Sequence, residues 1–184
     1  MRGDRCVERR QRGMLRMERG VRVGERAPYF RALAAGSGRE VSLSTCAGRR
    51  LVLIFHAQNT SWAAERVNRA VRERCPSPEE VVVASVVDLS LVPPLYWLTA
   101  NVMIGQAYDK KGAREVAREE PFGVDPAEYV LILQDWGGLI SRRFGVRDDG
   151  REATVVIIDE NSDIVGFYRG GGPMEDVLRM LEKG

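Results

Sequence analysis

The stretch LVLIFHAQNTSWAAERVNRAVRERC, residues 51–75, decides the fold class of this chain. It begins with five consecutive apolar residues, Leu51 to Phe55, a pattern typical of a strand that is covered on both faces. A short polar bend follows, and the hydroxyl of Ser61 is placed to cap a helix. Apolar residues then recur at helical spacing until Pro76 ends the pattern. The stretch therefore predicts a buried strand, a bend and a helix.

The rest of the chain alternates in the same way. Two further buried strands are predicted at 79–88 and 128–133, and ENSD (160–163) reads as the turn of a strand hairpin that precedes a C-terminal helix. Such alternation predicts an α/β fold with a central mixed β-sheet flanked by helices. We expect one domain over 21–184, with a helical insertion at about 89–127.

Composition narrows the classes of function. The chain has 184 residues, of which 44% are hydrophobic and 29% charged, and a net charge of +2. These values are typical of a soluble globular domain. The arginines alternate with acidic residues instead of forming a basic face, so no nucleic-acid partner is expected. Residues 1–20 are charged throughout and lack the apolar core of a signal peptide, so we expect a disordered extension or a start codon placed too early.

Cysteine and histidine usage sets expectations for metals and compartment. The cysteines Cys6, Cys46 and Cys75 are far apart, and His56 is the one histidine. A structural zinc site needs about four ligands at short spacings, so no metal and no cofactor are predicted. An odd number of cysteines without a framework pattern fits a reducing, cytoplasmic location.

Four strings in order along the chain resemble the peroxiredoxin family (alkyl hydroperoxide reductase and thiol-specific antioxidant proteins) of the thioredoxin-like superfamily. The resemblance implies a thioredoxin-like fold and a thiol-dependent antioxidant activity. The strings are Gly24, Ala27, Pro28 and Phe30 for G-x-x-A-P-x-F, GREVSLSTCAGRRLVLIF (38–55), RFGV (143–146) and REATVVIIDENSDIVGFYRG (151–170).

The resemblance fails where that family has its reactive sulfur. Against the signature P-x-x-x-T-x-x-C, His56 stands at the proline, Thr60 keeps the threonine and Ala63 replaces the cysteine. Against the thioredoxin-type C-x-x-C, Thr60 and Ala63 replace both cysteines. The degenerate site that the resemblance implies consists of His56, Thr60, Ser61, Trp62 and Ala63, with the supporting arginine falling at Glu152 or Arg151 and the cis-proline position at Ala153.

The missing sulfur has a chemical consequence. A thiol at a helix N-terminus is reactive because the helix end lowers its pKa to roughly 3.5–7.5. A hydroxyl has no comparable anion near neutral pH, and oxygen has no oxidation ladder through which peroxide reduction could cycle. The sequence therefore predicts a redoxin relative that works as a non-catalytic binding or interaction protein.

Three alternatives stay open. Cys46, which Arg49 and Arg50 follow closely, or Cys75 could support a thiol-dependent oxidoreductase from another place. His56 with Thr60 or Ser61 could form a nucleophile–base pair in a non-redox enzyme. The N-terminus of the helix near Ser61 could bind a small anion without any enzyme activity.

The predicted insertion contains a run without charge, from Leu89 to Tyr108. A helix that starts near Pro94 would be apolar most of the way round, so something must cover it. It either packs on its own domain or forms a homodimer or partner interface, and prolines and polar residues argue against a membrane span. The predicted interface residues are Tyr96, Trp97, Val102, Met103 and Ile104.

Overall fold

A computed structural model describes residues 20–118, 125–146, 152–170 and 174–182. The predicted extension 1–20, except its last residue, therefore lies outside the described residues, as do Cys6 and Arg151. The elements are β1 (Arg31–Leu33), β2 (Glu40–Ser42), β3 (Arg50–His56), the 3-10 turn η1 (Gln58–Thr60), α2 (Ser61–Arg74), β4 (Val81–Asp88), η2 (Pro94–Tyr96), α3 (Trp97–Arg118), α4 (Pro126–Tyr129), β5 (Leu131–Asp135), α5 (Leu139–Arg143), β6 (Thr154–Ile158), β7 (Ile164–Arg169) and α6 (Met174–Glu182).

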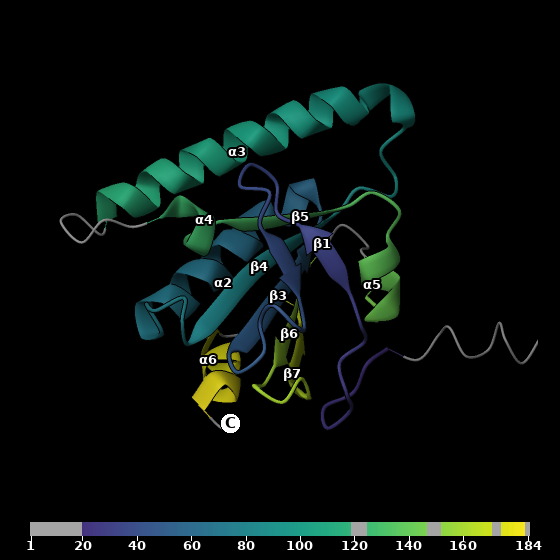
Figure 1. Cartoon of the computed structure of the whole chain (residues 1–184). Coiled ribbons are helices and arrows are strands. Elements are labelled where there is room, and N and C mark those ends of the chain that lie inside the picture. The colour runs from purple at the N-terminus through teal and green to yellow at the C-terminus, as the bar shows by residue number, and fades with distance from the viewer. Residues whose placement is uncertain (1–19, 119–124, 147–151, 171–173, 183–184) are drawn as a thin grey trace, which may run out of the picture.

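A five-stranded sheet forms the centre of the molecule, with strand order β5-β4-β3-β6-β7 (Figure 1). β3, β4 and β5 run parallel, whereas β6 is antiparallel to β3 and β7 to β6. The predicted mixed sheet flanked by helices is thereby confirmed. β1 and β2 form a separate antiparallel pair.

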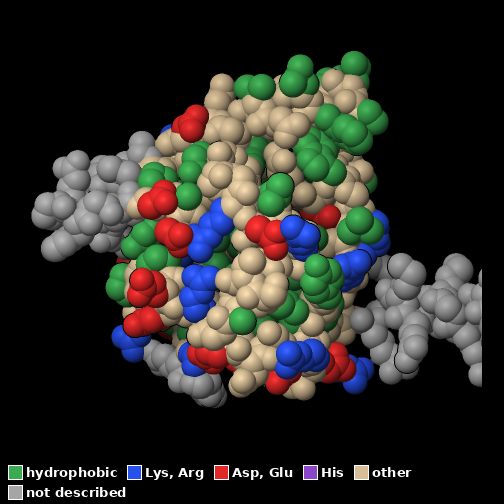
Figure 2. All heavy atoms as spheres, in the orientation of Figure 1, with side chains coloured by type: hydrophobic (Ala, Val, Ile, Leu, Met, Phe, Trp, Pro, Cys, Tyr) green, Lys and Arg blue, Asp and Glu red, His purple; other side chains and the backbone are tan. Residues whose placement is uncertain are grey.

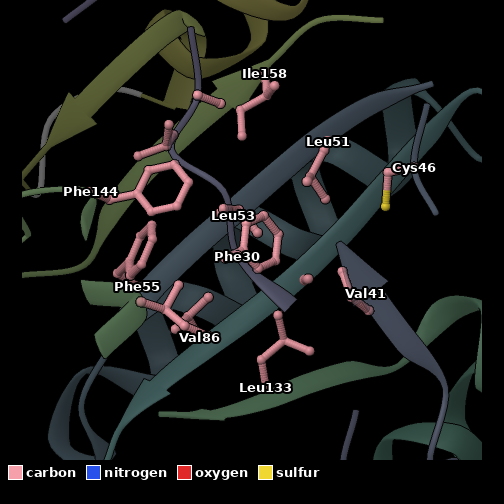
Figure 3. Packing of buried hydrophobic residues seen from close by; sticks show 14 of the residues in the cluster. Phe30, Val41, Cys46, Leu51, Leu53, Phe55, Val86, Leu133, Phe144 and Ile158 are labelled. Atoms are coloured by element: carbon pink, nitrogen blue, oxygen red, sulfur yellow. The ribbon is translucent and has the colours of Figure 1, made fainter. Parts of the chain in front are cut away.

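The strand at residues 51–55 is buried on both faces, as its unbroken apolar run predicts. On one face, Phe55 and Phe30 pack against Phe144 from the end of α5, with ring centroids 5.4 and 5.9 Å away (Figure 3). On the other face, Val52 and Ile54 belong to a second cluster that includes buried residues of α2 and α6. The sheet is the middle of three layers.

Two local expectations differ from the structure. Ser61 is the first residue of α2 and not its cap, because η1 moves the N-cap position to Thr60, whose side chain makes no cap hydrogen bond. The strand predicted at 128–133 begins only at Leu131. Asp125 accepts a hydrogen bond from the backbone N–H of Ala127 and starts the short helix α4 in front of it.

The predicted insertion forms η2 and the long helix α3, which crosses one end of the molecule above α4 and β5 (Figure 1). Ile104, Ala107 and Tyr108 pack against a small buried cluster at the end of β4 and the start of β5. The β1–β2 turn passes so close that a Cβ on Gly36, at φ +82°, would stand 2.3 Å from the Tyr108 ring. Within the described ranges, no helix combines the length and apolar character that a bilayer span requires.

Candidate binding cleft at the start of α2

The bend between β3 and α2 is held by hydrogen bonds within itself. His56 Nδ1 donates to the carbonyl oxygen of Ala57 over 2.9 Å. Thr60 Oγ1 accepts from the Ala57 N–H at 3.0 Å and donates to the Ala57 carbonyl oxygen at 3.3 Å. Because the buried Thr60 hydroxyl serves the turn in both directions, it is poorly placed to act as a nucleophile with His56 as base.

The other predicted residues of the degenerate site surround the first turn of α2. Ser61 is half-buried, Trp62 is largely exposed, and half-buried Ala63 packs against the cluster between the sheet, α2 and α6. Ala153, next to Thr154 on β6, is buried in the same cluster, close to the end of β3. Glu152, one of the two positions predicted for the supporting arginine, is exposed.

A cleft of about 1180 Å³ opens over this bend. One wall is the bend and the first turns of α2, and the opposite wall is α3. The floor is formed by side chains of β4 and β5, and α5 closes the side beyond the strand ends. Ligands in α/β proteins bind outside the carboxyl ends of parallel strands, which is where this cleft lies.

The two described cysteines lie far from the bend. Cys46 is 5% exposed and sits just before β3, so the length of that strand separates it from His56 by ~20 Å. Figure 3 shows its sulfur at the other end of the core cluster from Phe55. Cys75 follows the last residue of α2, ~20 Å from the first turn by the rise of a 14-residue helix.

The environment of Cys46 opposes thiolate formation. Burial raises the pKa of its thiol, and this effect outweighs the opposing hydrogen bond from Thr45 and the positive charge of Arg49. The expectation that the neighbouring arginines would stabilise a thiolate is therefore not met, because the desolvation cost is larger. A raised pKa leaves the group as a neutral thiol at pH 7.

We therefore expect Cys46 to react slowly with iodoacetamide in the folded protein. Its alkylation rate at pH 7 should be at least about tenfold below that of the same cysteine in urea, where burial is lost. The half-buried Cys75 provides an internal comparison, since it should react before Cys46. Mass spectrometry of timed samples measures both rates, and rapid alkylation of Cys46 in the native chain would contradict this assignment.

The structure divides the five predicted interface residues between different surroundings. Tyr96 and Met103 line the cleft, and Ile104 lines it too while packing against the domain. The Trp97 ring packs at a tilt against the Trp136 ring, with the ring centroids 5.3 Å apart, and Trp97 Nε1 donates to the Val92 carbonyl oxygen. Exposed Val102 does not line the cleft, nor do exposed Leu95 and Leu98, which were not predicted.

Sequence reasoning also missed several polar residues of the cleft. Ser85 interrupts the apolar strand VVVASVVD, and Ser141 and Arg142 come from α5. Lys111 of α3 reaches towards Glu65 of α2, with 3.9 Å between Nζ and Oε1, and so connects the two walls. Of these residues, only Ser85 could have been noticed in the sequence, as a lone serine inside an apolar strand.

Similarity to known proteins is found among solved structures. No family model matches the chain, and no curated protein matches it. A thiol peroxidase from Chromobacterium violaceum is similar, with a TM-score of 0.60 and 11% identity over 90% of this chain and 89% of the other. The chain has a thioredoxin-like fold.

Other solved structures with this fold are also similar. The pneumococcal exposed lipoprotein thioredoxin (Etrx1) of Streptococcus pneumoniae strain TIGR4 has a TM-score of 0.59 and 18% identity, over 85% of this chain and all of the other. A putative thiol:disulfide interchange protein DsbE from Chlorobium tepidum has a TM-score of 0.57 and 17% identity, over 89% and 97%. At 11 to 18% identity, these likenesses show the fold alone. The finer likeness to peroxiredoxins stays a prediction.

Proposed function

We propose that this protein is a non-catalytic binding protein built on the thioredoxin-like fold. The start of α2, where the reactive cysteine of redox-active relatives would be expected, has Thr60 at the N-cap position and Ala63 in the first turn. The Thr60 hydroxyl is occupied by the bend, and alanine has no reactive group. Cys46 and Cys75 are too distant to substitute without a large rearrangement.

The observation that carries the proposal is the cleft over the bend. A redox-active relative would need its reacting atom near this helix start. Here the same place opens into about 1180 Å³ of mostly apolar space, walled by the inserted helix α3. Pockets of this kind, with a few converging polar groups, are typical of binding sites. Ligand binding in the cleft over the bend is a role that needs no sulfur.

The test is thiol-dependent turnover. Purified full-length protein should reduce neither a disulfide substrate nor hydrogen peroxide faster than buffer containing the same reductant. The variants Cys46→Ser and Cys75→Ser should behave like the parent. Turnover by the parent that disappears in one of the variants would overturn the non-catalytic assignment and would identify the cysteine responsible.

We further propose that the outer face of α3 associates with a second copy of the chain. Seven large apolar side chains from Leu91 to Met103 are each at least 45% exposed, and four of them, Leu95, Trp97, Leu98 and Val102, lie outside the cleft. Figure 2 shows hydrophobic side chains gathered at the upper right, where α3 begins. Monomeric proteins rarely expose contiguous apolar patches larger than roughly 300–600 Å². A standard dimer interface covers about 800 Å² on each partner.

Val102→Asp tests this interface more cleanly than a change at Trp97, which packs within the chain. A charge in the centre of an apolar interface should shift the sedimentation equilibrium from dimer to monomer, weakening association by at least about tenfold. Val23→Asp is the matched control, because Val23 is similarly exposed but lies outside the insertion. A monomeric parent, or equal effects of the two variants, would contradict the proposal.

A further inference from the structure

The cleft has the shape of a trough. Its floor includes Val87 and Ile132 on neighbouring strands, and its α3 wall presents Ala100, Met103 and Ala107. The α3 residues recur at helical spacing on one side of the helix. Because two of them are alanines, the space between α2 and α3 stays open above an apolar floor. An apolar chain or ring fits such a space better than a polar one.

Two serines with little exposed surface line the cleft. Ser85 on the floor is 5% exposed, and Ser141 on α5 is 3% exposed. Neither hydroxyl makes a hydrogen bond within the described residues, and neither belongs to the fully buried atoms that lack a partner, so both open onto the cleft. They are therefore available to donate hydrogen bonds to a ligand there.

Charged side chains of both signs line the cleft. Glu65 faces Lys111, and Asp88 accepts a hydrogen bond from the Ser90 N–H. The Arg142 guanidinium lines the cleft and has no ion-pair partner within the described ranges. Ser61 opens the 14-residue helix α2, which has no side-chain cap at its N-terminus. A helix start with uncapped N–H groups favours an anion, and a guanidinium pairs well with a carboxylate.

Resting on the proposed binding role, we infer that the cleft takes one small molecule that combines an apolar chain or ring system with a carboxylate. The apolar part lies in the trough between α2 and α3. The carboxylate lies at the strand ends, between the first turn of α2 and Arg142, and the serine hydroxyls donate hydrogen bonds to the oxygen atoms of the ligand.

Isothermal titration calorimetry of the full-length chain tests this inference with three probes. Decanoate should bind with one site per chain. Acetate, which has the head without the chain, should show no binding at the same concentrations. The uncharged 1-decanol should bind at least about tenfold more weakly than decanoate, because it loses the charged contact with Arg142. Absence of decanoate binding, or equal affinity for 1-decanol, would overturn the assignment.

Matched pairs of residues supply the variants. Met103→Glu places a like charge in the cleft and should abolish decanoate binding, whereas Val23→Glu changes a similarly exposed residue outside both the cleft and the proposed interface and should leave it unchanged. Arg142→Gln should weaken binding about tenfold or more. Arg143→Gln is its control, because Arg143 donates to the Tyr29 carbonyl oxygen instead of lining the cleft. Equal effects within either pair would contradict the proposed position of the ligand.

The outcome is separable from that of the proposed function. If decanoate fails to bind while thiol-dependent turnover is also absent, the ligand class is wrong and the non-catalytic role stands. If decanoate binds but the parent turns over a disulfide or peroxide in a cysteine-dependent way, the ligand site stands and the non-catalytic role is wrong. Thermal unfolding of each variant, without ligand, confirms that the compared proteins are folded.

Discussion

Replacing Phe144 with alanine is expected to lower the free energy of unfolding by about 3–5 kcal/mol, the range for deleting a buried aromatic ring. Phe144 is fully buried and packs against Phe30 and Phe55. These contacts join the end of α5 to the central strand and to the segment before β1. Loss of the ring leaves a cavity that a sheet covered on both faces cannot collapse to fill.

Urea unfolding followed by circular dichroism measures this change. Leu139→Ala is the matched control, because Leu139 belongs to the same short helix but is 59% exposed. Its effect should stay within about 0.5 kcal/mol, as for most surface substitutions. A loss below about 1 kcal/mol for Phe144→Ala would show that this cluster contributes little to the stability of the fold.

Much of the fold could be predicted because the strands have clear sequence patterns. Leu51 to Phe55 form an apolar run too short for a helix, and the β6–β7 hairpin is marked by polar turn residues between two apolar runs. The start of β5 was missed because EYVLIL continues the apolar pattern backwards into α4. Asp125 followed by Pro126 is a helix-start signal that outweighs that pattern in the structure.

The candidate site could be predicted from the sequence only in part. The absence of a cysteine at the start of α2 is visible in the sequence, since Thr60 and Ala63 are single positions in a recognisable stretch. The cleft is not, because it forms only when α3 crosses α2 and the strand ends. A helix that is apolar most of the way round also does not show which side faces the domain, so Met103 and Val102 could not be separated from sequence alone.

Placing a sulfur at the start of α2 should produce the largest change in chemical behaviour. Ala63 lies in the first turn of α2, where the helix end lowers the pKa of a thiol to roughly 3.5–7.5. The thiol introduced by Ala63→Cys should therefore be alkylated at pH 7 at least about tenfold faster than Cys46, whose pKa is raised by burial. Cys75, at the opposite end of the same helix, is the matched comparison.

The central test compares hydrogen peroxide consumption by the parent and by Ala63→Cys in the presence of excess dithiothreitol. It measures whether one cysteine at the start of α2 is enough to give this fold peroxidase activity. In the variant, the thiolate attacks one peroxide oxygen, the O–O bond breaks, and a sulfenic acid and a hydroxide ion form. Dithiothreitol then reduces the sulfenic acid to the thiol, releasing water and the cyclic disulfide of dithiothreitol. We predict a rate equal to buffer for the parent and a clear, protein-dependent rate for the variant. Cysteine-dependent consumption by the parent at the rate of the variant would contradict the account.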